Sequence, residues 1–285
     1  MSNENKKSQI ISAKELLELK EKSTQLIIVD VSNDKNARDQ YENQHLENSI
    51  FVDLNIDLAD IKADYSEGGR HPLPEINFFI DFLQNIGITE DAHVVIYDHK
   101  NGANAAARFW WMLKSVGLDK VQVLDGGFKA AERFGYPLSK GIVQAKKAGK
   151  RLLTKEWILP TVSINSVENA SKSSEYLIVD VREPSRFKGE QEPIDLVAGH
   201  IPNSVNIPFT ENLDENGLFL EPQILHNKFQ EQLKSFPAEN IIFHCGSGVT
   251  ACHSLLALAH AGIEIPNLYV GSWSEWSRSG KEIAT

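Results

Sequence analysis

The residue best suited to do chemistry in this sequence is Cys245, which stands between an apolar run and a glycine-rich turn. Residues 241–244 predict a buried strand, and the leucines and alanines that follow residue 250 at helical spacing predict a helix. In so short a loop, backbone N–H groups can point inward, and the helix N-terminus adds the positive end of its dipole. Both effects favour the thiolate, which is the nucleophilic form of cysteine. We therefore expect Cys245 to be a catalytic nucleophile rather than a buried structural thiol.

Two hydroxyl groups share this loop with Cys245. Ser247 and Thr250 can donate hydrogen bonds to a reacting group, although Ser and Thr side chains often bond only to the local backbone. Cys252 follows in the first turn of the expected helix, where it is predicted to pack rather than to form a disulfide with Cys245. Two unpaired thiols are typical of a reducing compartment, so we predict a cytoplasmic protein.

Composition excludes several kinds of partner. The formal net charge is −10, and no basic cluster alternates with aromatic residues, so nucleic acid is not an expected partner. No apolar run approaches the length needed to span a membrane. The first nine residues are polar and contain lysine, so we expect no signal peptide.

Four segments of the first half recur in the same order in the second half. Residues 25–31, an apolar run ending near Asp30, resemble residues 175–181, and residues 93–98 resemble residues 240–245. This repeat predicts a duplicated α/β domain, each copy a mostly parallel sheet flanked by helices. We place the first domain at 8–139, a lysine-rich linker at 140–160 and the second domain at 161–285.

The repeat is unequal at its most informative position. Asp98 stands in the first copy where Cys245 stands in the second. The first domain therefore has no thiol at this position and is expected to be inactive, with the second domain carrying the chemistry.

Both halves of the chain resemble the two-domain rhodanese-type sulfurtransferases, which include thiosulfate and 3-mercaptopyruvate sulfurtransferases. The resemblance is carried by Cys-Gly-Ser-Gly-Val-Thr-Ala at 245–251, Gly-His-Ile-Pro at 199–202, Arg-Phe-Lys-Gly at 186–189, Gly-Ser-Trp-Ser-Glu-Trp at 271–276 and Arg-Phe-Trp-Trp at 108–111. It implies a tandem pair of rhodanese-like domains and a persulfide on Cys245. Sulfane sulfur would come from a small anionic donor and pass to cyanide or to a thiol, either thioredoxin or a small thiol. No cofactor and no metal are implied.

The resemblance also assigns roles to other residues. The loop formed by Gly246, Ser247, Gly248, Val249 and Thr250 is expected to hold the outer sulfur of the persulfide with its N–H groups. Arg186 corresponds to the arginine that binds the anionic group of the donor, for which a planar guanidinium is well suited.

Two positions depart from the mercaptopyruvate pattern. A second arginine is expected after Glu-Pro, but Ile194 stands there, and an expected aspartate of the first domain is Asn55. An Asp–His–Ser relay would thus become Asn55–His71–Ser247, and an amide cannot stabilise an imidazolium as a carboxylate does. Asp53 and Asp57 are nearby carboxylates that can substitute.

Arg70, beside His71, can replace the guanidinium lost at Ile194, or it can be an ordinary solvated loop residue. The loop after Cys245 lacks basic residues, which favours mercaptopyruvate, whereas the loss of the second arginine weakens a carboxylate clamp. We expect mercaptopyruvate as the donor, with thiosulfate as the alternative.

The sequence also bears on functions of other classes. A cysteine phosphatase requires an arginine where this loop has Ala251, so phosphoryl oxygens would lack their bidentate partner. A zinc site is disfavoured because His244 and Cys245 are adjacent strand residues whose side chains point to opposite faces. The remaining alternative is a non-catalytic rhodanese-like module that binds sulfur or an anion for regulation.

Overall fold

The computed structural model describes residues 8–32, 34–233 and 236–285. Its contacts divide the chain into two units: an N-terminal unit of residues up to 57 and 76–156, and a C-terminal unit of residues 58–75 and 157–285. Residues 58–75 therefore group with the C-terminal half, unlike the continuous boundaries expected from the repeat. Hydrogen bonds explain the grouping, because the Gly68 N–H donates to Glu275 and the Arg70 N–H to Ser274.

The N-terminal unit is built on a five-stranded parallel sheet with the order β1-β6-β5-β2-β4. Its strands are β1 (Ile10–Ile11), β2 (Leu26–Ser32), β4 (Ser49–Asp53), β5 (His93–Tyr97) and β6 (Val121–Leu124). Its helices are α1 (Ala13–Lys22), α2 (Ala37–Asn43), α3 (Leu54–Asp57), α4 (Ile76–Asn85), α5 (Ala105–Ser115) and α6 (Gly127–Phe134). The short strands β3 (His45–Leu46) and β7 (Leu138–Ser139) pair antiparallel beside the sheet.

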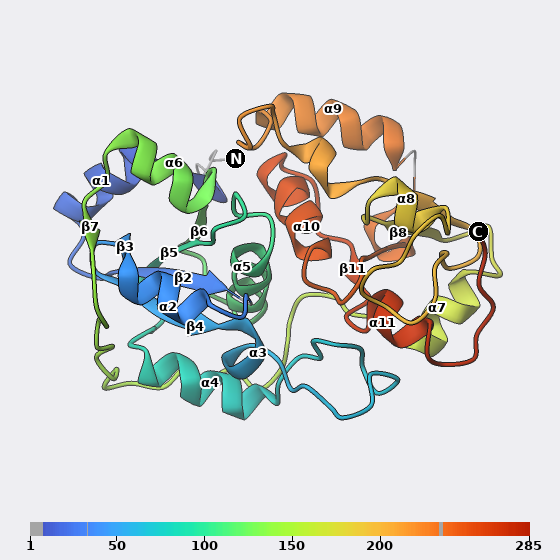
Figure 1. The fold of residues 1–285 in the computed structure, drawn as a ribbon, viewed down its shortest axis with the longest axis horizontal. Helices are drawn as coiled ribbons and strands as arrows, with labels where there is room; N and C mark the ends of the chain where they lie inside the picture. Colours follow the sequence, from blue (N-terminus) through green and yellow to red (C-terminus); the bar gives the residue numbers. More distant parts are fainter. Residues whose placement is uncertain (1–7, 33, 234–235) are drawn as a thin grey trace, which may run out of the picture. The chain divides into compact units, whose positions relative to one another are not determined.

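Both faces of this sheet are covered, which is why its strands are continuously apolar. Tyr97 on one face packs into a cluster with Leu16 of α1 and Phe128 of α6. The opposite face is covered from α4 and α5, where Phe79 and Phe109 meet edge to face at 6.2 Å. Figure 1 shows α1 and α6 together on one side of the strands and α4 on the other side.

The C-terminal unit is built on a four-stranded parallel sheet with the order β11-β10-β8-β9. Its strands are β8 (Leu177–Asp180), β9 (Ser204–Asn206), β10 (Ile241–His244) and β11 (Asn267–Leu268). Its α-helices are α7 (Ile164–Ala170), α8 (Pro184–Phe187), α9 (Pro222–Gln232), α10 (Ala251–His260) and α11 (Ser272–Trp276). Two 3-10 turns cover Phe209–Asn212 and Ala238–Asn240.

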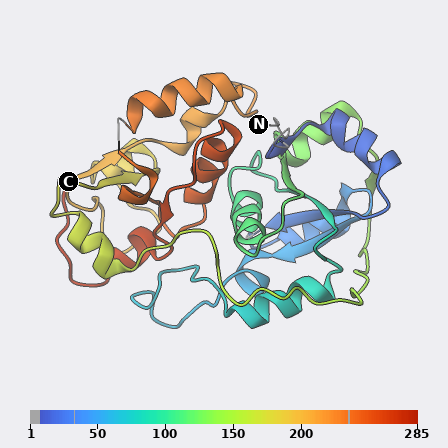
Figure 2. The same ribbon diagram turned by 180° about the vertical axis from the view of Figure 1, so that it is seen from behind.

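Helices also cover both faces of the second sheet. Ile178 and Ile242 pack on one side against Val167 of α7 and against Trp273 and Trp276 of α11. The helices α9 and α10 lie together on the other side, in both views of the molecule (Figures 1 and 2). The expected α/β class, with mostly parallel sheets flanked by helices in each half, is confirmed.

The segment predicted as a linker has no helix or strand after β7 and follows the N-terminal unit for most of its length. The Gly141 N–H donates to the Glu42 carbonyl, and the Ala148 N–H donates to the Gln84 carbonyl. Arg151 Nε lies 2.5 Å from Asp81 Oδ1. These bonds hold the segment against α2 and α4.

The described residues offer neither a membrane-spanning helix nor a metal-binding cluster. No helix there combines the length and the apolar character needed to cross a lipid bilayer. Within the same ranges, no three His, Cys, Asp or Glu side chains are grouped so that they could hold a metal ion.

Asp98, at the end of β5, determines the shape of the loop that leads into α5. Its carboxylate is 2% exposed and accepts four backbone hydrogen bonds, from the N–H groups of Lys100, Gly102, Asn104 and Ala106, at 2.7 to 3.2 Å. Burial raises the pKa of Asp98, and these four bonds lower it in part. The loop therefore folds around a negative charge that belongs to the chain itself.

We expect Asp98→Ala to lower the free energy of unfolding by about 2–4 kcal/mol, because buried N–H groups lose their acceptor. The measurement is urea denaturation of the full chain. Asp119, whose side chain is fully exposed, provides the matched control, and Asp119→Ala should change stability by no more than about 0.5 kcal/mol. Equal effects of the two substitutions would contradict a structural role for the Asp98 carboxylate.

Candidate active site

Cys245 follows β10 directly, and α10 begins six residues later at Ala251. It is 2% exposed, and the structure contains no disulfide at either cysteine. The strand, loop and helix expected around this thiol are all present. The thiol therefore lies at the carboxyl end of a central parallel strand, the edge at which α/β sheets commonly bind ligands.

The first turn of α11 holds the Cys245 loop in place. The Trp273 N–H donates to the Cys245 carbonyl at 3.0 Å, and the Ser274 N–H donates to the Gly246 carbonyl at 2.8 Å. The Cys245 N–H donates to the hydroxyl of Ser272 at 3.2 Å. Both carbonyls at the start of the loop are thus turned toward α11.

Some backbone N–H groups further along the loop are not used in hydrogen bonds within the described part of the protein. Among the described residues, the N–H groups of Ser247 and Val249 find no protein acceptor. In the corresponding loop of the N-terminal unit, which begins at Asp98, the N–H groups of Lys100 and Gly102 bind the Asp98 carboxylate. The C-terminal loop therefore retains donors that can bind an added negative group.

Gly248 is required by both conformation and space. Its φ is +71°, and a β-carbon there would lie 2.4 Å from the carbonyl oxygen of Val270. No other residue type fits this point without moving the backbone of the loop or that of residue 270.

His71 and Ser247, two predicted site residues far apart in the sequence, meet in the C-terminal unit. His71 Nδ1 lies 2.8 Å from Ser247 Oγ, so the two side chains share a hydrogen bond. Asn55 lies in α3 of the N-terminal unit, where its N–H donates to Asp53 Oδ1. Asp57 Oδ2 accepts the Asp53 N–H at 2.9 Å, so both candidate replacement carboxylates cap α3.

The two predicted anion-binding arginines meet beside the residue that follows Cys245. A β-carbon at Gly246 would lie 3.0 Å from Arg70 Nη2 and 3.5 Å from Arg186 Nη2. The Arg70 side chain is 17% exposed and that of Arg186 10% exposed. Both guanidinium groups therefore lie close to Gly246, and a side chain there would require the Arg70 guanidinium to shift slightly.

Two carboxylates that the sequence analysis did not identify hold these arginines. Glu192 receives Arg186 through Nε at 3.1 Å and Nη2 at 2.7 Å, and the N–H groups of Ile194 and Asp195 also donate to it. Asp195 pairs with Arg70 and accepts from Arg186 at 3.2 Å. Burial acts to raise the pKa of Glu192, but the hydrogen bonds from Arg186 and the backbone hold that pKa below its usual value.

A second buried pair lies at the end of β8, next to β10. Arg182 binds both oxygens of Asp180 and the Gly199 carbonyl, and its guanidinium lies 4.6 Å from the ring centre of Trp273. Burial acts to raise the pKa of Asp180, but the charges of His244 and Arg182 lower it overall. Arg182 also reaches Glu192 at 3.2 Å, so this pair supports the carboxylate that holds Arg186.

Thr250 and Cys252 stand at the start of α10. Thr250 precedes α10 and makes no side-chain capping bond. Cys252 is fully buried in the first turn, and its thiol donates to the Gly248 carbonyl at 3.2 Å. Cys252 therefore packs as the sequence predicted.

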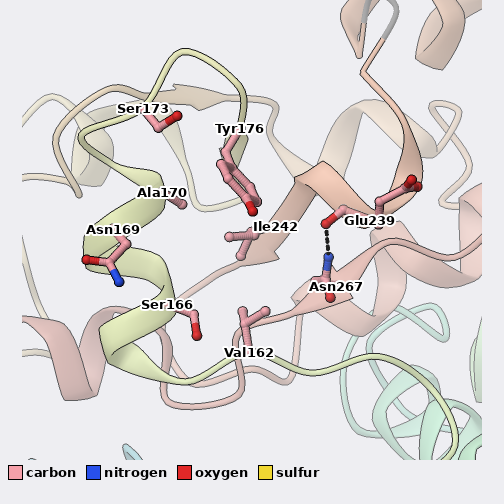
Figure 3. Close-up of a pocket in the computed structure, with 9 residues that line it drawn as sticks. All are labelled: Val162, Ser166, Asn169, Ala170, Ser173, Tyr176, Glu239, Ile242 and Asn267. Carbon is pink, nitrogen blue, oxygen red and sulfur yellow. Dashed lines mark hydrogen bonds between the residues drawn. The ribbon is translucent and has the colours of Figure 1, made fainter.

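A pocket of about 460 Å³ lies in the C-terminal unit at the amino end of β10 (Figure 3). Tyr176 points toward Ile242 within it, and Asn267 donates to the Glu239 carbonyl at its side. Since Cys245 follows the carboxyl end of β10, this pocket is not part of the candidate active site. Its lining also contains no cysteine, histidine or arginine.

Comparisons with known proteins agree with this architecture. A model described as "Rhodanese-like domain" matches residues 12–133 and 163–279. The chain is 40% identical over 239 residues to "Probable 3-mercaptopyruvate sulfurtransferase" of Pseudomonas aeruginosa, covering 83% of this chain and 82% of that protein. It is 34% identical over 248 residues to thiosulfate sulfurtransferase of Rattus norvegicus, covering 86% and 81%.

A solved structure of a sulfurtransferase has the same fold. 3-Mercaptopyruvate sulfurtransferase from Leishmania major superposes with a TM-score of 0.83 at 28% identity, covering 97% of this chain and 76% of that one. The two halves of the molecule are thus two rhodanese-like domains. The chain belongs to the rhodanese family, and the resemblance predicted from its motifs is confirmed.

We expect Gly248→Ala to cost about 3 kcal/mol or more in stability, since a left-handed conformation and a backbone clash act together. Gly262 provides a matched control, because its φ of +76° is similar but a β-carbon there would meet nothing within 4 Å. Gly262→Ala should cost only about 1–2 kcal/mol. Urea denaturation of both variants measures the difference, and equal losses would show that the contact with Val270 is not restrictive.

Proposed function

We propose that this sulfurtransferase takes the thiol sulfur of 3-mercaptopyruvate onto Cys245 as the outer, sulfane sulfur of a persulfide and passes it to a thiol or to cyanide. The donor would lie over Gly246, bound by Arg70, Arg186 and His71. The backbone of residues 246–250, from Gly246 through Ser247, Gly248 and Val249 to Thr250, would hold the persulfide. Thiosulfate is the alternative donor.

One observation carries this proposal: the loop of the N-terminal unit is filled by the Asp98 carboxylate. An aspartate oxygen and the outer sulfur of a cysteine persulfide are both two bonds beyond the β-carbon. Asp98 therefore indicates where an outer sulfur on Cys245 would lie within the equivalent loop. Four N–H groups converge on that position around Asp98, which is the environment that stabilises a negatively charged sulfur.

The chemistry then follows in two balanced steps. The Cys245 thiolate attacks the donor sulfur, an S–S bond forms, and the carbon–sulfur bond breaks with its electron pair going to carbon. The proton of the donor thiol moves to that carbon, so pyruvate leaves and an anionic persulfide remains. An acceptor thiolate or cyanide next attacks the outer sulfur and the Cys245 thiolate is released.

The Ser247–His71 pair is suited to move the proton in the first step. Its hydrogen bond of 2.8 Å gives a hydroxyl that can donate to the donor carbonyl while the imidazole exchanges a proton with it. Burial of Cys245 and of the surrounding arginines limits water at the site and strengthens these interactions.

The donor preference is argued from the charge of the site. The loop after Cys245 carries no basic residue, and Arg186 is already bound by Glu192 and Asp195. Arg70 also pairs with Asp195, but its Nη2 is the guanidinium nitrogen nearest the Gly246 β-carbon position, which supports its role as a replacement for the arginine absent at Ile194. Two guanidinium groups that already share carboxylates have little charge left for a dianion, and this suits a donor with one carboxylate.

The same proposal includes the organisation of the chain. Residues 8–139 would form the inactive rhodanese-like domain, 140–160 the linker and 161–285 the catalytic domain, with residues 58–75 completing the catalytic site. The acceptor would be thioredoxin, a small thiol or cyanide, in the reducing cytoplasm that two unpaired cysteines suit.

We expect reduced wild-type protein exposed to 3-mercaptopyruvate to gain one sulfur atom by intact-mass measurement. Cys245→Ser should gain none, whereas Cys252→Ser, which removes the buried neighbouring thiol, should still gain one. A parallel exposure to thiosulfate tests the alternative donor. Sulfur gained by Cys245→Ser would disprove the assignment of the nucleophile, and no gain with either donor would return the protein to a non-catalytic anion-binding module.

We expect Arg70→Ala to raise the KM for 3-mercaptopyruvate about tenfold or more, at least as strongly as Arg186→Ala, because Arg70 loses a charge-assisted bond to the donor. Steady-state kinetics measure the effect. Arg133, an exposed arginine of α6, is the control, and Arg133→Ala should leave KM unchanged. An unchanged KM in Arg70→Ala would rule out its role in donor binding.

A further inference from the structure

One buried carboxylate is shared by three arginines from separate segments of the C-terminal unit. The Asp195 side chain is 0% exposed, and its Oδ1 pairs with Arg70 and lies 3.4 Å from Arg278 Nη1. Its Oδ2 accepts from Arg186 at 3.2 Å and lies 3.6 Å from the β-carbon position of Gly246. Asp195 is therefore the nearest negative charge to the place where a donor anion would bind.

The charges in direct contact around Asp195 nearly balance. Arg70, Arg186 and Arg278 contribute three positive charges, and Asp195 and Glu192 remove two of them. The buried Arg182–Asp180 pair adds nothing to the total. Glu183 lies 3.8 Å from Arg186, but it is 53% exposed and therefore screened by solvent. The cluster thus presents one net positive charge.

We propose that Asp195 tunes this site to donors that carry a single negative charge. This inference rests on the proposed function, in which the donor lies over Gly246. The carboxylate of 3-mercaptopyruvate brings one negative charge, which the cluster neutralises. Thiosulfate brings two, and its second charge would be buried without a partner, which is costly in a site of such low exposure.

Asp195 also acts through Arg70 as a positioning residue. It pairs with Nη1 of the Arg70 guanidinium, and the backbone N–H of Arg70 is fixed separately by Ser274 at 3.0 Å. The amide of Asp195→Asn can still accept a hydrogen bond from Arg70, but it no longer cancels a positive charge. Asp195→Asn therefore removes the negative charge of this side chain while nearly preserving its shape.

The test is the ratio of kcat/KM for thiosulfate to kcat/KM for 3-mercaptopyruvate. In Asp195→Asn this ratio should rise about tenfold, through a lower KM for thiosulfate, because one more positive charge faces the dianion. Arg278→Gln removes a positive charge at the same carboxylate and should lower the ratio. Glu168→Gln, which removes a carboxylate paired with Lys281 and Lys172 elsewhere in this unit, should leave it unchanged.

The kinetic results with the two donors can overturn the proposed role of Asp195. Equal loss of activity with both donors in Asp195→Asn would mean a purely structural role and would overturn it, as would an unchanged ratio. If Asp195→Asn does not fold, as judged by its thermal melting, Arg278→Gln decides alone: a lower ratio supports the proposal and an unchanged ratio overturns it.

The charge preference of the site can also be measured by binding alone, without sulfur transfer. Sulfite and pyruvate, the products that the two donors leave behind, can be titrated into Asp195→Asn and wild-type protein by calorimetry without any turnover. Tighter binding of sulfite relative to pyruvate in the variant supports the charge preference, and no relative change overturns it. Failure of Cys245 to gain sulfur would instead disprove the proposed function alone.

Discussion

The hydrogen bonds from the first turn of α11 to the carbonyls of Cys245 and Gly246 are the constraint on which the candidate site depends. They fix the direction of the peptide groups at the start of the loop. The same short helix holds the segment that carries Arg70 and His71, through Ser274 and Glu275. A five-residue helix therefore sets the distance between the thiol and the groups that would bind and protonate a donor.

The corresponding loops of the two halves both direct backbone N–H groups inward, but they differ in the negative group that these N–H groups can bind. In the N-terminal unit the Phe128 N–H donates to the Asp98 carbonyl, as the Trp273 N–H donates to that of Cys245. The loop that follows must satisfy several converging N–H groups, since unpaired buried donors are costly. Asp98 satisfies four of them with its own carboxylate, so that loop needs no added anion to pair these groups. Cys245 has the shorter side chain, and its loop can accept an added sulfur instead.

Much of this arrangement was predictable from local sequence. The run 241–244, the glycines after Cys245 and the helical spacing beyond residue 250 defined strand, loop and helix, and the repeat defined the fold class. The roles of Glu192 and Asp195 were not predicted, because their partners Arg70 and Arg278 are distant in the chain and ion pairs leave no periodic pattern. The two carboxylates beside Ile194 were a signal that could have been followed, since they stand where an expected arginine is absent.

The charge balance of the cluster is compatible with the proposal that Arg70 takes the place of an arginine absent at Ile194. Guanidinium groups gathered in a buried site repel one another unless carboxylates are placed among them, and Glu192 and Asp195 do this without a donor. An additional arginine at position 194, beside Glu192 and Asp195, would add a positive charge that only a bound anion could neutralise. An arginine from the segment 58–75 keeps the total charge suitable for a single carboxylate, and Ser274 and Asp195 fix it over Gly246. The proposed donor site thus keeps a net positive charge for an anion while most of its guanidinium charge is balanced by carboxylates of the chain.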